Sequence, residues 1–372
     1  MPIKTLTREK YRAGTDWALT AAVLLLVGFG LLMLYSASRY AAAANLGDGA
    51  FYLKKQMLGL ALGLMAMFGL SRVNYRVMEK WAMPVFLVSL ALLGLVFIPG
   101  VGVENYGARR WIDLPGFTIQ PSEIAKFGLI IFAAAYMSKN SGRVTTFRGM
   151  LPVLGAGGAT ALLIILEPNM SITMCVILLM LAMLFIGGAS IKHFILLALP
   201  LAALVAALIV MEPYRLSRLA AFLDPWASPL DEGFQLIQSF YAIGSGGLFG
   251  VGLFNSRQAK MFLPFAESDF ILSIIIEELG LFGAVLLLAL YLFIIVRLVK
   301  ISLSAPDRFG CYYAAGVAAI IAIQVLINIA VVTGSIPPTG LPLPFISAGG
   351  SSLVVFLGAV GTAQNVCKAG IK

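Results

Sequence analysis

The sequence predicts an all-α polytopic membrane protein with about ten transmembrane helices. Of its 372 residues, 60% are hydrophobic and only 12% are charged, and the mean hydropathy is +0.96. Soluble domains carry about 25% charged residues, so this chain cannot build an ordinary water-facing surface. Long apolar runs approach the roughly 20 residues that cross a bilayer as a helix. Polar or Gly/Pro-rich segments separate these runs, as expected for helices connected outside the hydrocarbon.

The apolar runs define the expected helices. The first run, from Trp17 to Leu34, follows a basic segment as a signal peptide would. Its 18 residues exceed the roughly 7–15 of a signal-peptide core, so we expect a retained helix. No soluble domain or tandem repeat is evident, and residues 1–372 are expected to form one transmembrane domain. The runs lie at 17–38, 57–71, 81–98, 121–138, 150–166, 171–188, 191–211, 270–296, 310–333 and 345–366.

The distribution of Lys and Arg predicts the orientation. With a cytoplasmic N-terminus, 16 of the 26 basic residues fall in cytoplasmic segments and nine on the opposite side. Basic residues concentrate in cytoplasmic loops, so the bias favours cytoplasmic N- and C-termini. The segments 99–120, 212–268 and 334–344 then lie outside. The second, between helices 7 and 8, is a large extracytoplasmic loop of 57 residues, and a connection that long is usually functional.

Two kinds of partner are excluded by composition. The net charge of +9 could indicate nucleic acid, but the basic residues are not interleaved with aromatics in a cluster, and cytoplasmic loops account for them. With three cysteines, no CxxC and a single histidine, the chain lacks the convergent ligands of a zinc site. We predict membrane lipids as partners, no nucleic acid and no metal site built from protein side chains.

A pair of ionisable residues lies at the start of the fourth run. Glu123 and Lys126 are three residues apart in QPSEIAK, on one face of a helix. Charges inside a membrane are costly and usually functional. A buried ion pair that orients helices is the equally weighted structural alternative.

Basic residues gather on the predicted outer side. Arg109 and Arg110 adjoin a tryptophan in YGARRWIDLPG, and Arg215 and Arg218 follow in EPYRLSRL. Arginine and tryptophan can simply anchor a helix at the interface. Arginine also binds phosphate or pyrophosphate through its fork of donors, which favours an anionic headgroup as ligand. Lys260, on the same side, joins these substrate-binding candidates.

The 212–268 segment also contains GFQLIQSFYAIGSGG. Its glycines are not followed by Gly-Lys-Ser/Thr, which argues against a nucleotide loop. Gln235, Gln238 and Ser239 could share one side of a short interfacial helix and offer hydrogen bonds, or could be ordinary polar packing.

Asp269 stands where this segment enters the eighth run, directly after Glu267 and Ser268. A carboxylate at this boundary can cap the helix N-terminus. Alternatively, partial desolvation can raise its pKa and suit it to general-base catalysis. Position alone favours the cap.

Five motifs in order resemble one family. They are RRWIDL…QPSEIAK, YRLSRLAAFLDPW, GFQLIQSFYAIGSGGLFGVGL, LP…SDFI…EELG and GLPLPFIS-GGSSL, within residues 20–366. Together they look like the SEDS family (shape, elongation, division and sporulation) of FtsW/RodA/SpoVE-type peptidoglycan glycosyltransferases. The short motif GLFNSRQ is more similar to the division and sporulation branch than to the elongation branch.

The resemblance implies a polymerase of lipid II in the bacterial cytoplasmic membrane, with its active site extracytoplasmic. It implies Asp269 as the catalytic base, with Arg110, Arg215 and Arg218 as family arginines and Glu123/Lys126 as the membrane-embedded pair. Ser351, in the GGSS turn, is carried over as a substrate-binding candidate. The expected partner is a class B penicillin-binding protein, a transpeptidase. No nucleotide is required, and a divalent cation could assist the pyrophosphate.

This chain departs from the family pattern at three places. Phe265 occupies the usual glutamate position of Pro-Glu-x-x-Thr-Asp, and Glu267 could take over an auxiliary role. Asn169 replaces the aspartate of Glu/Gln-Pro-Asp, and Ala348 replaces a tyrosine. The changes at Phe265 and Asn169 keep open a non-catalytic scaffold for a transpeptidase. A lipid-precursor flippase is the other alternative, because ten spans, the Glu123/Lys126 pair and outward arginines would also suit a pathway for a lipid headgroup.

Overall fold

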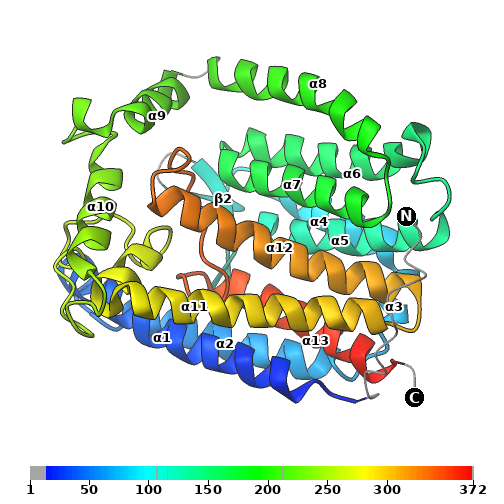
Figure 1. The fold of residues 1–372 in the computed structure, drawn as a ribbon, viewed down its shortest axis with the longest axis horizontal. Helices are drawn as coiled ribbons and strands as arrows, with labels where there is room; N and C mark the ends of the chain where they lie inside the picture. Colours follow the sequence, from blue (N-terminus) through cyan, green and yellow to red (C-terminus); the bar gives the residue numbers. More distant parts are fainter. Residues whose placement is uncertain (1–13, 106–107, 115, 211–212, 371–372) are drawn as a thin grey trace.

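The computed structural model describes residues 14–105, 108–114, 116–210 and 213–370. A helix overlies each of the ten apolar runs (Figure 1). The basic residues Lys4, Arg8, Lys10, Arg12 and Lys372, which entered the orientation argument, lie outside the described residues. The helices at the runs are α1 (Trp17–Leu46), α2 (Phe51–Leu70), α4 (Ala82–Leu95), α5 (Pro121–Lys139), α6 (Phe147–Leu166), α7 (Met170–Ile186), α8 (Ile191–Val210), α11 (Ile271–Ser304), α12 (Arg308–Val332) and α13 (Gly350–Lys368).

Six of these helices are long and apolar enough to cross a membrane, namely α1, α2, α6, α11, α12 and α13. Helices α4 and α7 are apolar but shorter. Several helices begin at a side-chain cap: Asp16, Thr146, Asn169 and Asp307 each accept a hydrogen bond from the backbone N–H three residues later. Such caps satisfy amide groups that have no partner in the first helical turn.

The segment 99–120 folds as a small antiparallel sheet, so the all-α prediction is wrong here. Strand β2 (Ala108–Leu114) pairs with β1 (Gly102–Asn105) on one side and with β3 (Phe117–Ile119) on the other. Gly116, between β2 and β3, has φ 78, a left-handed conformation that glycine adopts without steric cost. The alternation of side chains along β2 sends neighbouring residues to opposite faces.

The predicted 212–268 loop is largely folded. It contains α9 (Pro213–Leu223), the 3₁₀ turn η1 (Pro225–Ala227) and α10 (Phe234–Gly246), and irregular chain then leads to Asp269. Helices α9 and α10 lie at one end of the bundle, and the short helix α3 (Arg76–Lys80) lies at the other (Figure 1). Helix α8 runs along the edge of the bundle, and its Ile195 and Leu199 are exposed.

Helix α11 is broken at Gly280, whose φ of 68 and ψ of −171 are not helical. The chain after α10 fills the break. Backbone bonds join Val251 N to Glu277 O at 2.9 Å and Leu281 N to Gly247 O at 2.9 Å. A Cβ at position 280 would stand 2.4 Å from the carbonyl oxygen of Leu248, so only glycine fits this approach.

Two carboxylates beside this break bind the same stretch of chain. The Glu277 side chain accepts hydrogen bonds from the Ser256 hydroxyl and the Arg257 amide, and Glu278 accepts one from Ser36 of α1 at 2.5 Å. Both glutamates are buried. They therefore tie residues 256–257 to α11, and α11 to α1.

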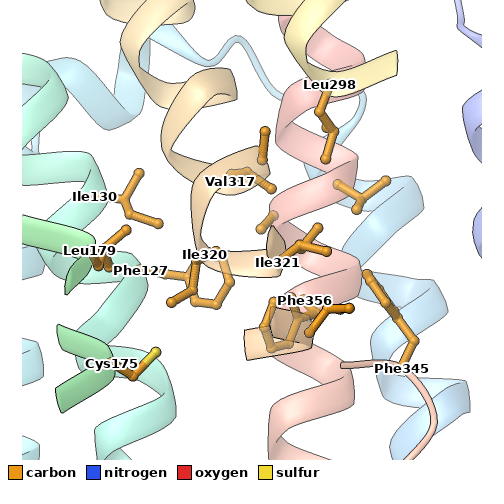
Figure 2. Packing of buried hydrophobic residues seen from close by; sticks show 14 of the residues in the cluster. Phe127, Ile130, Cys175, Leu179, Leu298, Val317, Ile320, Ile321, Phe345 and Phe356 are labelled. Atoms are coloured by element: carbon orange, nitrogen blue, oxygen red, sulfur yellow. The ribbon is translucent and has the colours of Figure 1, made fainter. Parts of the chain in front are cut away.

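The hydrophobic core lies where α5, α7, α12 and α13 meet. Phe127 of α5 packs edge-to-face on Phe356 of α13, with ring centroids 5.1 Å apart, and Phe345 packs on the same ring at 5.4 Å. Figure 2 shows Ile320 and Ile321 of α12 among these rings. This packing fixes α13 against α5, and thereby the charged pair at the start of α5.

Candidate functional site

The backbone at Asp269 and the two residues before it is held by hydrogen bonds from two segments. Its carbonyl oxygen accepts a hydrogen bond from Asn328 of α12 at 2.9 Å, and the same amide group donates to Leu341 O. The carbonyl of the preceding Ser268 accepts from Ser347 at 2.6 Å, and Glu267 O accepts from Ala348 N at 2.8 Å. The catalytic candidate is thus fixed in place by the Pro-rich segment 334–348 and by α12.

The carboxylate of Asp269 is half-buried and faces the start of α7. Ser268 donates to its Oδ1 at 2.7 Å. A Cβ added at Gly340 would lie 3.0 Å from Asp269 Oδ2 and 3.8 Å from Ser171 Oγ, so both oxygens lie next to Gly340. The N-cap of α11 is Phe270, and Asp269 is therefore not the cap that its position alone favoured.

Electrostatics connect Asp269 with two of the predicted arginines. Burial raises the pKa of its carboxyl above the ordinary value, while the Ser268 hydrogen bond and the positive charges of Arg218 and Arg110 lower it in part. Burial, and next the nearby Asp269, also raise the pKa of Glu267. Asp269, Arg110 and Arg218 therefore belong to one site, with Glu267 beside it.

The two adjacent arginines of β2 separate. Arg110 donates to the backbone carbonyls of Glu167, at 3.2 Å, and of Pro168. Arg109 is exposed and pairs with Glu104 of β1 at 3.3 Å. Since neighbouring strand residues point to opposite faces, only Arg110 lies toward Asp269.

The remaining basic candidates differ in position. Arg218 of α9 is half-buried and donates to the carbonyl of Pro338 at 3.3 Å. Lys260 is exposed, with its ammonium 5.7 Å from the ring centroid of Tyr40. The side chain of Arg215 lies outside the described residues.

The charged pair of α5 is completely buried. Lys126 Nζ lies 2.7 Å from Glu123 Oε1, with side-chain exposures of 0% and 1%. The second carboxylate oxygen accepts from Ser352 of α13 at 2.9 Å. Ser351, the predicted serine, instead accepts from the amide of Gln120 at 3.3 Å. Both serines therefore attach α13 to the start of α5.

The three polar residues of α10 do not act together. Ser239 is buried and bonds Ser273 Oγ at 2.7 Å and Val332 O at 2.8 Å, which is the polar-packing alternative. Gln235 donates to Pro264 O at 3.2 Å, and Gln238 is half-buried. Through Pro264, Gln235 is hydrogen-bonded to the segment that leads into Asp269.

The roles of several residues at the site escaped sequence reasoning. Asn169 caps α7 by accepting from Ile172 N, a task that asparagine and aspartate perform equally well. Glu167 is buried beside Arg110, and burial, partly offset by that arginine, raises its pKa to about 8. Asn328, a polar side chain in the middle of an apolar helix, carried a signal that could have identified it.

A metal site receives no support from side-chain grouping. Within the described parts of the chain, no three His, Cys, Asp or Glu residues are grouped so that they could hold a metal ion. The arginines near Asp269 are thus the cations that the described site offers to an anionic ligand.

The fold and the site define a multi-pass membrane protein that presents a carboxylate and two arginines at one end of a helix bundle. A family model described as "Cell cycle protein", FtsW/RodA/SpoVE, matches residues 16–370. The chain belongs to this family, which confirms the resemblance seen in its motifs.

Similar proteins cover nearly the whole chain. Stage V sporulation protein E of Bacillus subtilis is 42% identical over 358 residues, which are 96% of this chain and 98% of that protein. A probable peptidoglycan glycosyltransferase FtsW of a Geobacter species (strain M18) is 39% identical over 354 residues, covering 95% and 96%. Both agree with the division and sporulation branch.

Solved structures share the fold. A chain from a study of how a peptidoglycan synthase complex coordinates polymerization and crosslinking superposes with a TM-score of 0.78 at 31% identity, covering 95% of this chain and 97% of the other. The rod shape determining protein RodA of Thermus thermophilus gives 0.70 at 29% identity, covering 96% and 98%.

Proposed function

We propose that this chain is a peptidoglycan glycosyltransferase that polymerises lipid II, with Asp269 as general base. The observation that carries the assignment is a half-buried carboxylate within electrostatic reach of arginines from two separate elements. Relatives about 40% identical along nearly their whole length bear the name of this activity, which supports the same reaction here.

The reaction needs a base and an anion site close together. Asp269 takes the proton of the acceptor's 4-hydroxyl as that oxygen forms a bond to the anomeric carbon of the donor. The bond from that carbon to the lipid pyrophosphate breaks, and the pyrophosphate leaves with the electron pair. Arg110 and Arg218 stabilise the negative charge that develops on it, as preorganised cations do for transferring phosphoryl oxygens.

The proposed topology has ten spans in the bacterial cytoplasmic membrane, with both termini cytoplasmic. Segment 212–268 then lies outside, between the seventh and eighth spans, and Asp269 faces the extracytoplasmic surface. The charge bias of 16 to nine supports this orientation. A lipid-linked substrate would reach the site from within the same bilayer.

The proposed partner is a class B penicillin-binding protein whose transpeptidase crosslinks the new glycan. The similarity to a chain of a peptidoglycan synthase complex supports such an assembly. We therefore expect polymerisation to be strongest when the partner is present.

The test uses purified full-length protein and labelled lipid II, with and without the partner. Asp269→Asn should lower the polymerisation rate by about 10²–10⁴-fold, the usual contribution of a general base. Asp231→Asn is the matched control, because Asp231 is an exposed carboxylate in the same outer segment, and it should retain activity. Full activity in Asp269→Asn would exclude the proposed role.

The same preparation separates the two alternatives. A flippase would move lipid II across liposomes in the Asp269 variant without forming polymer. A scaffold would support growth in that variant while the complex never polymerises lipid II.

A further inference from the structure

A small pocket lies at the end of the bundle opposite to Asp269, between α1, α2 and α13. Its volume is about 140 Å³. These three helices pack side by side (Figure 1), and the pocket opens near the first residue of α1 and the last residues of α2 and α13. Its lining comprises Thr15, Trp17, Thr20, Met67, Phe68, Ser71, Arg72, Gln364 and Lys368.

The charged groups of this pocket are both cations. Lys368 donates to the carbonyl of Ser71 at 3.0 Å, and Arg72 donates to the carbonyl of Phe68 at 3.3 Å. Among the described residues, neither cation lies within 4.0 Å of a carboxylate. Their hydrogen bonds to neutral carbonyls hold them in place without neutralising their charge.

Asp16, whose backbone is hydrogen-bonded to the pocket wall, has a carboxylate that is already paired with an arginine. Gln364 joins the pocket wall to Asp16 through a bond of its Nε2 to Asp16 O at 2.8 Å. The Asp16 carboxylate pairs with Arg297 at 2.7 Å, and it is almost fully buried. The field in the pocket is therefore positive.

The remaining lining suits the depth of lipid headgroups. Trp17 is 71% exposed, and Phe68 is also exposed, so an apolar rim adjoins the two cations. Tryptophan concentrates at the membrane interface, and basic pockets between transmembrane helices on the cytoplasmic side bind anionic headgroups. The hydroxyl of Ser71 and the side chain of Thr20 add polar groups to the wall.

We propose that this pocket binds the phosphate of an anionic phospholipid, with Arg72 and Lys368 as its cationic ligands. Acyl chains of the bound lipid lie along Trp17 and Phe68. The site is separate from Asp269 and does not depend on the proposed glycosyltransferase activity. It gives the protein a second lipid contact, made with a membrane component instead of the substrate.

The test measures binding of phosphatidylglycerol and of phosphatidylcholine to the purified full-length protein by native mass spectrometry. Wild type should prefer phosphatidylglycerol. Each cation near the surface contributes about fivefold, so Arg72→Gln with Lys368→Gln should weaken that preference by about 25-fold. The charge-retaining pair Arg72→Lys and Lys368→Arg should keep most of it.

A matched control removes two exposed cations elsewhere in the chain. Arg143→Gln with Lys300→Gln changes the net charge equally and should leave the preference intact. Equal binding of the two lipids by wild type, or an unchanged preference in the Arg72/Lys368 variant, would overturn the proposal. Displacement of the lipid by millimolar inorganic phosphate would also overturn it, since the site would then take a soluble anion. Thermal midpoints of all variants verify that each is folded.

Discussion

Removal of Lys126 tests the buried pair of α5 directly. In Lys126→Met, Glu123 loses an ammonium group 2.7 Å away and remains at 1% or less exposure, so water cannot replace the partner. Breaking a buried pair in this way costs about 3–5 kcal/mol. Ser352 still donates at 2.9 Å, and its bond to a charged group is worth about 1.5–3 kcal/mol, so Ser352→Ala should cost less than Lys126→Met.

The decisive comparison is the double variant Glu123→Gln with Lys126→Met. Because no buried charge remains, it should be more stable than Lys126→Met alone, with a coupling energy of about 2 kcal/mol or more. The measurement is reversible unfolding in mixed detergent micelles, with exposed Lys300→Met as control, expected within about 0.5 kcal/mol of wild type. A double variant whose loss equals the sum of the two single losses would refute the reasoning.

Three further predictions concern the neighbourhood of the site. Gly340→Ala places a Cβ 3.0 Å from Asp269 Oδ2 and should reduce polymerisation. Gly47→Ala is the control, because Gly47 has nearly the same φ (72, compared with 73 for Gly340) but open space around it, so this variant should lose only stability. Thermal melting and activity assays on both variants distinguish the two effects. The pKa of Glu167 is raised from 4.5 to about 8, so between these pH values the folded state holds a proton that the unfolded chain has released. The free energy of unfolding should therefore fall as pH rises through this window, by up to about 1.4 kcal/mol per pH unit. Melting curves of Glu167→Gln across the same pH range should lose that slope. A general base acts when ionised, so activity should be lost as pH falls through the raised pKa of Asp269, and Arg218→Gln, which removes a charge that lowers this pKa, should shift the acid limb of the rate profile to higher pH.

Hydropathy was sufficient to locate the helices because apolar side chains continue along the whole length of each run, on the faces that pack in the bundle as well as on the exposed faces. The strands of 99–120 escaped prediction for the opposite reason. The strand β3 has three residues, and its hydrogen bonds come from pairing with β2, a non-local contact that no local pattern records. The short helix expected around Gln235, Gln238 and Ser239 corresponds to α10, whereas α9 escaped prediction because the rest of the segment was treated as one connection.

The site was predicted residue by residue with uneven success. Motifs identified Asp269, Arg110 and Arg218, which the fold brings together, but also Arg109, which the alternation of β2 turns away. Ser352 and not Ser351 reaches Glu123, because consecutive residues of a helix point about 100° apart and only one of the two serines can face the pair. Such phase relations become visible only when the helix ends are known.

The break in α11 gives the outer chain an unusual kind of closure. Residues 247–252 form backbone hydrogen bonds with α11 on both sides of Gly280. Asp269 lies on the stretch of chain that leads from residue 252 to this break. That stretch is therefore a loop whose two ends are both held at α11. A cut at the exposed Met261 or Phe262 would leave both new ends tethered, because Asn328 and Ser347 hold the side that carries Asp269. Limited proteolysis there should yield a nicked protein that remains assembled, with Asp269 still held in position.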